Sequence, residues 1–413
     1  MQNIHRFEEK LESILKKVEN LDPTNRKLVL SFYENYCFKE NLSIGRKEKV
    51  LSVLRQVSLK TKKPLNKFKE KDLQFLKTEL NKQGFSQHTI KSYLSILKCF
   101  FRWLNKKKFA SLLESEEWRI KNPYSIPQHQ LSSDDLPTEE MCLKMLVAGS
   151  VAQSAYLALL AGAGLRNSEA LLLKRENVHP QEGGTVVLNV SGKTGRREGI
   201  KVHAGFAYYI LQHYNNSIFS NPNDFFITKK NGVHLEERNG LQWLQSMSVK
   251  AGFGKWFSCT FSTGFRARKY SGRKVNPHIW RHFHATWCLE NLNPIIAKKR
   301  LWGRVDTGMD RIYEHISKQK EQEEYDRATG NDVANQKKSL IEPKPCFKCK
   351  KQWPSTFELC PDCSLFLDPS KEYEKFEKLK DEKEKQKALE QEVSDLKQMV
   401  AALYKYIGKI GQK

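Results

Sequence analysis

The stretch PHIWRH at residues 277–282 sets His278 and Arg281 three positions apart, which places both side chains on one face of a helix or turn. It lies within a longer segment, residues 240–289, that contains eight Lys or Arg and no Asp or Glu. The missing acids indicate that a carboxylate is unwelcome around this pair. We therefore expect His278 and Arg281 to face one shared anionic group.

The composition of the whole chain also points to an anionic partner. The 413 residues include 71 Lys and Arg against 47 Asp and Glu, a net charge of +24, with a pI near 9.5 and a mean hydropathy of −0.64. Such an excess on folded domains most often marks a nucleic-acid-binding protein. Apolar runs such as residues 156–161 are far shorter than the roughly 20 residues that span a membrane, and the N-terminus lacks a signal-peptide core. We expect a soluble, cytoplasmic, nucleoid-associated protein.

Hydrophobic periodicity divides the chain into domains. Residues 1–20 predict one amphipathic helix, and residues 21–121 predict an all-helical domain because repeated amphipathic segments occur without strand-like alternation. The Pro-containing stretch 122–137 is typical of a linker. Residues 138–330 are again mainly helical, with one antiparallel hairpin whose turn is predicted at 191–197.

The positive charge is concentrated in the helical domain. Residues 46–108 contain 18 Lys and Arg against 4 Asp and Glu, so 14 of the 24 net charges lie in 63 residues. A solvated helical surface usually explains Lys-rich helices. Such a large excess of Lys and Arg over Asp and Glu favours a surface that binds phosphates instead.

Four short motifs in the second domain occur in a meaningful order. They are GLRNSE at 164–169, SGKTG at 191–195, PHIWRH at 277–282 and LWGR at 301–304, with Tyr313 ten residues after the glycine of the last motif. In this order and spacing they resemble the tyrosine recombinase (phage integrase) family. The resemblance implies a SAM-like core-binding domain, a mixed but mainly helical catalytic domain, and double-stranded DNA as the partner. It also implies a homo-tetramer on paired sites, with no membrane and no small-molecule substrate.

These residue types suit phosphodiester cleavage without water. The reaction requires a nucleophile, donors for the extra charge on a pentavalent phosphate, and an acid for the leaving oxygen. The resemblance implies that Tyr313 attacks the phosphate and that Lys193 protonates the departing 5′-oxygen. Arg166 and Arg281 would bind the non-bridging oxygens through planar forks that lysine cannot reproduce. A 3′-phosphotyrosine link conserves bond energy, so rejoining needs neither ATP nor a metal.

Three further histidine, glutamate and arginine positions complete the candidate site. Glu169 and His282 are expected to support their neighbours, although an isolated motif of this kind would favour a simple salt bridge between Arg166 and Glu169. The family usually has His or Trp after the glycine of the last motif, where this chain has Arg304. Arginine also donates hydrogen bonds to phosphate, and Trp302, two residues earlier, is an alternative donor.

A second tyrosine competes for the role of nucleophile. Tyr325 lies twelve residues after Tyr313, but its neighbours include Glu321, Glu323, Glu324 and Asp326. These acids would repel a phosphate. Tyr313 is therefore the preferred nucleophile.

Four of the nine cysteines form two CxxC pairs with ten residues between them: Cys346, Cys349, Cys360 and Cys363. Four thiolates at this spacing predict a zinc ribbon over residues 341–368 with a structural, non-catalytic Zn²⁺. A redox role needs only one CxxC, and a disulfide is rare inside a cell. Some archaeal members of the resembled family are similar in carrying such a ribbon after the catalytic tyrosine.

The C-terminal segment, residues 371–413, is typical of a charged helix that ends in a short coiled coil. Between residues 371 and 390 seven Lys balance seven acidic residues. Apolar residues then alternate at spacings of four and three: Leu389, Val393, Leu396, Val400, Leu403, Ile407 and Ile410. Self-association through this seam is slightly favoured over docking of the helix on its own catalytic domain.

Taken together, the patterns predict a multidomain, mainly α-helical, site-specific DNA recombinase or integrase of the kind found on mobile genetic elements. Two alternatives remain open. One is a catalytically weakened DNA-binding accessory protein derived from a recombinase. The other is a type IB topoisomerase-like or resolvase activity, which uses the same chemistry on a different substrate geometry.

Overall fold

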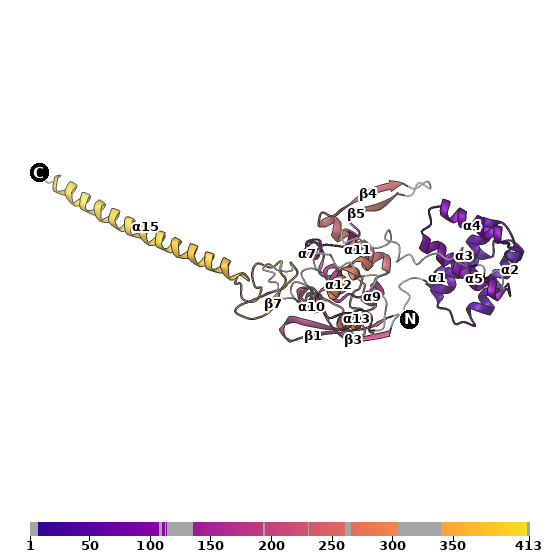
Figure 1. Cartoon of the computed structure of the whole chain (residues 1–413). Coiled ribbons are helices and arrows are strands. Elements are labelled where there is room, and N and C mark those ends of the chain that lie inside the picture. Colours follow the sequence, from indigo (N-terminus) through magenta and orange to yellow (C-terminus); the bar gives the residue numbers. More distant parts are fainter. Residues whose placement is uncertain are drawn as a thin grey trace, which may run out of the picture. The chain divides into compact units, whose positions relative to one another are not determined.

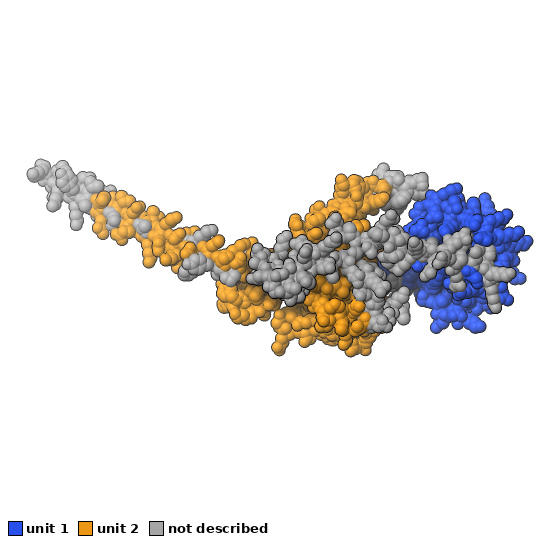
Figure 2. Space-filling view, in the orientation of Figure 1, with its two compact units in different colours: residues 1–134, 235–237, 308–315 blue, residues 135–234, 238–307, 316–413 orange. Residues whose placement is uncertain are grey.

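The chain is described from a computed structural model, which covers residues 7–106, 110, 111, 113, 135–192, 195–229, 231–260, 266–303, 305 and 340–410. It divides into two compact units, coloured blue and orange in Figure 2. The described residues up to Leu113 belong to unit 1, and most of those from Asp135 onward belong to unit 2. No helix in these ranges is long and apolar enough to cross a membrane.

Unit 1 is helical throughout its described part. Asp22 caps the second helix by accepting a 3.0 Å hydrogen bond from the backbone of Asn25, and Ser86 caps the fifth in the same way. Packed aromatic rings fill the core, with Phe32 5.2 Å from Phe100 between centroids. The helices are α1 (Phe7–Val18), α2 (Pro23–Phe32), α3 (Ile44–Thr61), α4 (Glu70–Lys82) and α5 (Gln87–Trp103).

Helix α8 (Val151–Ala163) forms the centre of unit 2. Every residue from Ser154 to Ala163 is buried, because this stretch is apolar on all sides. Gly162 lets α10 (Ala204–Asn216) approach closely, since a Cβ there would lie 2.5 Å from the Cβ of Phe206. The other helices around it are α7 (Glu139–Ala148), α9 (Asn167–Leu171), α11 (Glu237–Lys250), α12 (Pro277–Asn291) and α13 (Pro294–Trp302).

The predicted hairpin is part of a three-stranded antiparallel sheet. Its strands β2 (Thr185–Gly192) and β3 (Gly195–Lys201) pair down to Gly192 and Gly195, so the strands run further toward the tip than the sequence predicts. A third strand, β1 (Val178–Gln181), adds to β2. The sheet therefore includes Arg196 and Arg197, which the sequence pattern assigned to the turn.

A second hairpin was not predicted. Strands β4 (Gly254–Thr260) and β5 (Arg266–Gly272) pair in register as a separate two-stranded ribbon, visible at the edge of unit 2 in Figure 1. Tyr270 anchors its base, because its hydroxyl lies 2.8 Å from the Ser248 hydroxyl of α11. Two consecutive exposed residues break the alternation of each strand, Phe257 and Ser258 on β4 and Arg268 and Lys269 on β5, which explains why the pattern was missed.

The cysteine-containing segment packs on helix α10. The ring of Tyr208 lies 4.9 Å from that of Phe357 and 5.8 Å from that of Trp353, and Ile341 is buried. Gly205 makes this contact possible, since a Cβ there would lie 2.1 Å from the Ile341 carbonyl oxygen. The segment contains the short strands β6 (Lys344–Pro345) and β7 (Gln352–Trp353).

The last described element is one long helix, α15 (Pro369–Ile410). Four residues of its predicted seam are well exposed, with 62% for Leu389, 44% for Val393, 60% for Leu396 and 47% for Val400. These exposed fractions do not agree with burial of the seam on the catalytic unit, at least over the side chains that are described. The coiled coil remains a prediction.

Candidate active site

The first motif lies in a tight turn between α8 and α9. Gly164 ends α8 in the left-handed conformation, with φ of 63°, and the following Leu165 donates a 3.2 Å hydrogen bond back to the Leu159 carbonyl. A Cβ on Gly164 would also lie 2.4 Å from Cδ2 of His284. Both the backbone angle and the close approach of α12 require glycine here, and the turn places Arg166 at the start of α9.

Arg166 and Glu169 form a reciprocal pair. The Nη1 group of Arg166 donates to Glu169 Oε1 at 2.8 Å, and the Arg166 backbone N–H donates to Oε2 at 2.8 Å. The simple salt bridge that the sequence left open is therefore present. The arginine side chain nevertheless keeps 27% of its surface exposed, whereas Glu169 keeps 2%. The pair holds a buried carboxylate beneath a partly accessible guanidinium.

Arg197 is a member of this site that sequence reasoning missed. Its Nη2 group donates to Glu169 Oε2 at 2.6 Å, while Nη1 donates to the carbonyl oxygens of Arg300 at 3.0 Å and Leu301 at 3.2 Å. Its side chain is 5% exposed. The structure buries Arg197 and Ile200 on β3, but a spacing of three does not match the two-residue period of a strand, and residue 197 was predicted to lie in the turn.

Arg281 reaches the same cluster from α12. Asn276 caps this helix by accepting from the Ile279 backbone at 3.1 Å. Arg281 donates from Nη1 to the Gly164 carbonyl and from Nη2 to the Leu301 carbonyl at 2.7 Å, and it lies 4.0 Å from Glu169 Oε2. The guanidinium thus joins the first, third and fourth motifs through their backbones.

The charges around Glu169 are mostly positive. Burial by itself would raise the pKa of the Glu169 carboxyl, but the Arg197 charge, the backbone hydrogen bond from Arg166 and the charges of Arg166 and Arg281 together hold it below its ordinary value. Three arginines and one ionised glutamate sum to 3 − 1 = +2 within the cluster. This arrangement suits a bound anion.

The two predicted histidines lie side by side on the first turns of α12. The rings of His278 and His282 are 4.5 Å apart between centroids, at 82° to each other. His278 reaches the surface and His282 is buried. Partial burial of the His278 ring, followed by the charges of Arg281 and Arg166, lowers its pKa, so the imidazole is neutral at neutral pH. The direct ring contact places His282 where it can support His278.

Three predicted catalytic residues, Lys193, Arg304 and Tyr313, lie outside the described residues, as does the rival Tyr325. The residues that precede two of them are described. A Cβ on Gly192 would lie 2.7 Å from Glu169 Oε1, and Gly303 ends α13 with φ of 76° beside Arg197. Lys193 and Arg304 therefore each follow a glycine that lies beside the arginine cluster. Trp302, the alternative donor, is buried at the end of α13.

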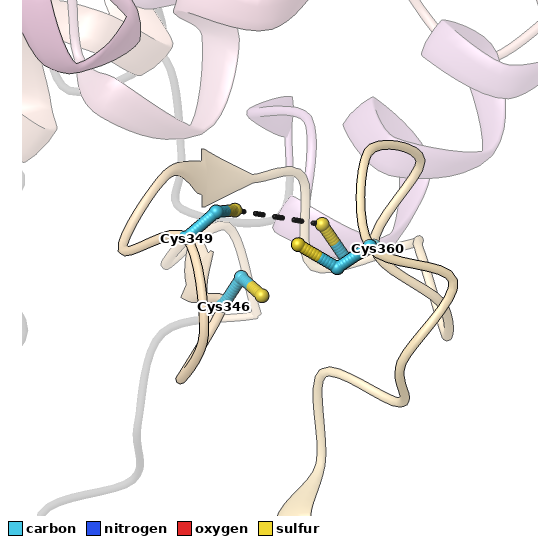
Figure 3. A group of neighbouring side chains, drawn as sticks. Cys346, Cys349 and Cys360 are labelled. Atoms are coloured by element: carbon cyan, nitrogen blue, oxygen red, sulfur yellow. Dashed lines mark hydrogen bonds between the residues drawn. The ribbon is translucent and has the colours of Figure 1, made fainter.

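The four predicted metal ligands are brought together (Figure 3). The Sγ atoms of Cys346, Cys349, Cys360 and Cys363 all lie within 4.8 Å of one another, and those of Cys349 and Cys360 are 3.7 Å apart. Tetrahedral Zn²⁺ with Zn–S bonds of about 2.3 Å requires sulfur atoms roughly 3.8 Å apart. The donor set and spacing fit a closed zinc site.

The two CxxC turns share one backbone geometry. Each is followed by a residue in the left-handed conformation, Lys350 with φ of 62° and Ser364 with φ of 54°. Each of these residues donates a backbone hydrogen bond to the first cysteine of its turn, at 2.9 Å and 2.7 Å. This duplicated turn is what directs two cysteines from each half toward one point.

No family model matches the chain. It is similar to tyrosine recombinase XerC of Alcanivorax borkumensis, with 25% identity over 268 residues covering 62% of this chain and 78% of the relative. It is also similar to tyrosine recombinase XerA of Pyrococcus horikoshii, with 29% identity over 248 residues covering 59% of this chain and 75% of the relative.

Among solved structures, the fold is similar to a lambda integrase dimer bound to a COC′ core site. The TM-score is 0.52 at 14% identity, over 70% of this chain and 95% of that one. At this identity the likeness concerns the fold alone.

Proposed function

We propose that this chain, a homologue of the tyrosine recombinases, is a site-specific DNA recombinase that cleaves and rejoins strands through a 3′-phosphotyrosine intermediate. The observation that carries the proposal is the cluster of Arg166, Arg197 and Arg281 around one buried glutamate, with His278 beside it. Its net positive charge matches a phosphate that gains negative charge during the reaction.

Arg166 and His278 are the members of the cluster most open to DNA. Both side chains reach solvent, whereas Arg281 is 3% exposed in its side chain and uses two N–H groups on backbone carbonyls. A guanidinium carries five N–H donors in a fixed fork, a geometry that suits binding a backbone carbonyl and a phosphate oxygen together. We assign Arg166 and His278 to direct contact with the phosphate, with Arg281 binding it from beneath.

The remaining steps are assigned to residues outside the described part of the chain. Tyr313 is the nucleophile, and Lys193, which directly follows Gly192, is the acid for the leaving 5′-oxygen. Arg304, which directly follows Gly303, adds a donor to the phosphate. Because the phosphotyrosine bond preserves the energy of the broken phosphodiester, neither ATP nor a catalytic metal takes part.

Assembly on DNA follows from the other parts of the chain. The basic helices of unit 1 bind duplex DNA together with unit 2, and two strands at a time are exchanged between paired sites in a homo-tetramer. The four cysteines hold one structural Zn²⁺, which folds the ribbon against α10. The seam of α15 associates with a second copy.

A suicide DNA substrate tests the chemistry. Incubation of the wild-type protein with a nicked duplex carrying its own recombination site should give a covalent protein–DNA adduct that survives denaturing gels, and Tyr313→Phe should abolish it. Tyr325→Phe is the matched control and should keep the adduct. Absence of an adduct with the wild type, despite DNA binding, would favour the weakened accessory protein. Loss of the adduct only in Tyr325→Phe would show that Tyr325, and not Tyr313, is the nucleophile.

A further inference from the structure

We propose that Arg197 is a positioning residue for strand cleavage, which holds Glu169 and the C-terminal end of α13 in the arrangement that the phosphate-binding arginines need. The inference rests on the proposed recombinase function and extends it to a residue on β3. Arg197 belongs to none of the four motifs. Its contacts are made to two of them.

The fork of Arg197 connects separate elements of the site. One nitrogen, Nη2, binds Glu169 Oε2 at 2.6 Å, and the other, Nη1, binds the carbonyls of Arg300 and Leu301 at 3.0 and 3.2 Å. β3, the start of α9 and the end of α13 are thereby fixed to one planar group. Such a planar donor with fixed angles transmits a position in a way that a flexible ammonium does not.

Arg197 and Arg281 share acceptors. Both donate to the Leu301 carbonyl, and both lie near Glu169 Oε2, at 2.6 and 4.0 Å. The last carbonyls of a helix lack partners within that helix, so those of α13 need outside donors. If Arg197 is removed, Arg281, which already donates to Leu301 and lies 4.0 Å from Glu169 Oε2, is the described guanidinium that can replace it at both acceptors. It would move toward them and away from the phosphate.

Burial makes the charges of Arg197 and Glu169 depend on each other. Arg197 is 5% exposed and Glu169 is 2% exposed, so neither charge is compensated by bulk water. Truncation of one partner of a buried pair leaves the other charge unsolvated. A 1 Å displacement of a catalytic group costs on the order of 100-fold in rate.

The pH dependence of cleavage, which follows the titration of Glu169, distinguishes a positioning role of Arg197 from a purely stabilising one. Among the described residues, the charged side chains that face this carboxyl are Arg166 at the start of α9, Arg197 on β3 and Arg281 on α12, and Gly192 at the end of β2 also lies against it. Removal of Arg197 removes one of three cations, so the pKa of Glu169 rises. The carboxyl then takes up a proton at higher pH, and cleavage is lost at a higher pH on the acid side than in the wild type.

The test compares Arg197→Met, Arg197→Lys and the control Arg196→Met. Arg196 is the exposed neighbour on the same strand and forms a surface ion pair with Glu198 at 2.7 Å. For each, three quantities are measured on the full-length protein: DNA affinity, the single-turnover rate of adduct formation at saturating suicide substrate from below pH 4 to pH 8.5, and the unfolding temperature.

We expect Arg197→Met to lower the saturated cleavage rate about 100-fold with DNA affinity within about threefold, and to shift the acid limb of the pH profile upward. Arg197→Lys should restore the position of the acid limb, because it returns the charge, but only part of the rate. Arg196→Met should match the wild type.

Two results overturn the inference. One is a saturated rate and pH profile of Arg197→Met equal to the wild type; the other is a loss of rate that follows the unfolded fraction with an unchanged acid limb. If Arg197→Met does not fold, Arg197→Lys provides the test. A wild-type cleavage rate in Arg197→Lys would exclude a role for the planar guanidinium of Arg197. Failure of the proposed function is distinct, because then the wild type itself forms no adduct.

Discussion

The Nη2 group of Arg281 donates a 2.7 Å hydrogen bond to the carbonyl oxygen of Leu301, twenty residues further along the chain. This bond ties the helix of the third motif to the end of α13, where the fourth motif begins. The other nitrogen of the same guanidinium reaches the carbonyl of Gly164 in the first motif. One side chain therefore sets the spacing of three motifs that are dispersed over almost 140 residues.

Arg281→Lys should disable the site while keeping its charge. An ammonium cannot reach Gly164, Leu301 and a phosphate oxygen together, so the single-turnover cleavage rate should fall about 100-fold. Adduct formation with a suicide substrate measures the effect. Arg196→Lys, at an exposed arginine on β3, is the control and should keep the wild-type rate. Equal rates for both variants would contradict the assignment of Arg281.

Glu169→Gln should destabilise unit 2, because three arginines then lose their one shared negative charge. Removing one partner of a buried ion pair costs about 3 kcal/mol, measurable by urea unfolding at pH 7. The pKa of Glu169 in the folded protein is lowered, so its contribution is present above the ordinary pKa of 4.5 and is lost as the pH falls through the folded value. The variant should therefore lose less stability than the wild type on acidification below pH 4.5. The exposed Glu198→Gln is the control.

Zinc removal should loosen the ribbon from α10. The contacts of Tyr208 with Trp353 and Phe357 depend on a fold that the metal holds together, so chelation or Cys360→Ser should lower the unfolding temperature by about 5 °C. Elemental analysis should find one zinc per chain in the wild type and little in the variant. Cys259→Ser, on β4 and outside the cluster, should retain the metal. A metal-free ribbon with unchanged Trp353 fluorescence and unfolding temperature would refute the zinc site.

The β4–β5 ribbon should contribute to DNA binding through its exposed cations. Lys255, Arg268 and Lys269 lie on its two strands, with the Lys255 ammonium 4.9 Å from the exposed Phe257 ring. Replacing all three cations by Gln should make the slope of log K against log salt less steep by up to about 2.7, because each cation that binds a phosphate adds about 0.9 to the slope. The same replacements at Lys380, Lys383 and Lys387 of α15 are the control. An unchanged slope in the ribbon variant would show that these cations do not touch DNA.

The exposed seam of α15 should drive self-association. Truncation after Ser370, or Leu396→Glu within the seam, should lower the mass measured by light scattering at micromolar concentration, because an isolated apolar stripe gains stability only against a second helix. Gln398→Glu, on the exposed face of the helix opposite the seam, should have little effect. An unchanged mass after truncation would rule out the coiled coil as the assembly element.

Much of the architecture could be predicted from local patterns. The helices of unit 1 and α15 follow from apolar residues at helical spacing, and the cysteine cluster follows from two CxxC turns whose geometry is set within six residues. The link of Arg166 to Glu169 could be predicted as a possibility for the same reason, since both lie in one turn of chain. What was missed is equally specific. The alternation that would have revealed β4 and β5 is broken on each strand by two consecutive exposed residues, and Arg197 was counted in a turn.

The order of the motifs, the residue types that suit phosphate chemistry and the two CxxC pairs can be predicted from the amino-acid sequence, because each depends on residue identity and spacing along the chain. Only the tertiary structure decided that Arg197, Arg281 and the end of α13 meet at Glu169, and that the ribbon packs on α10. Those contacts join residues 20 to about 150 positions apart. They form because a buried charge must find its partners wherever the packed core brings them, and no periodicity in the chain records that requirement.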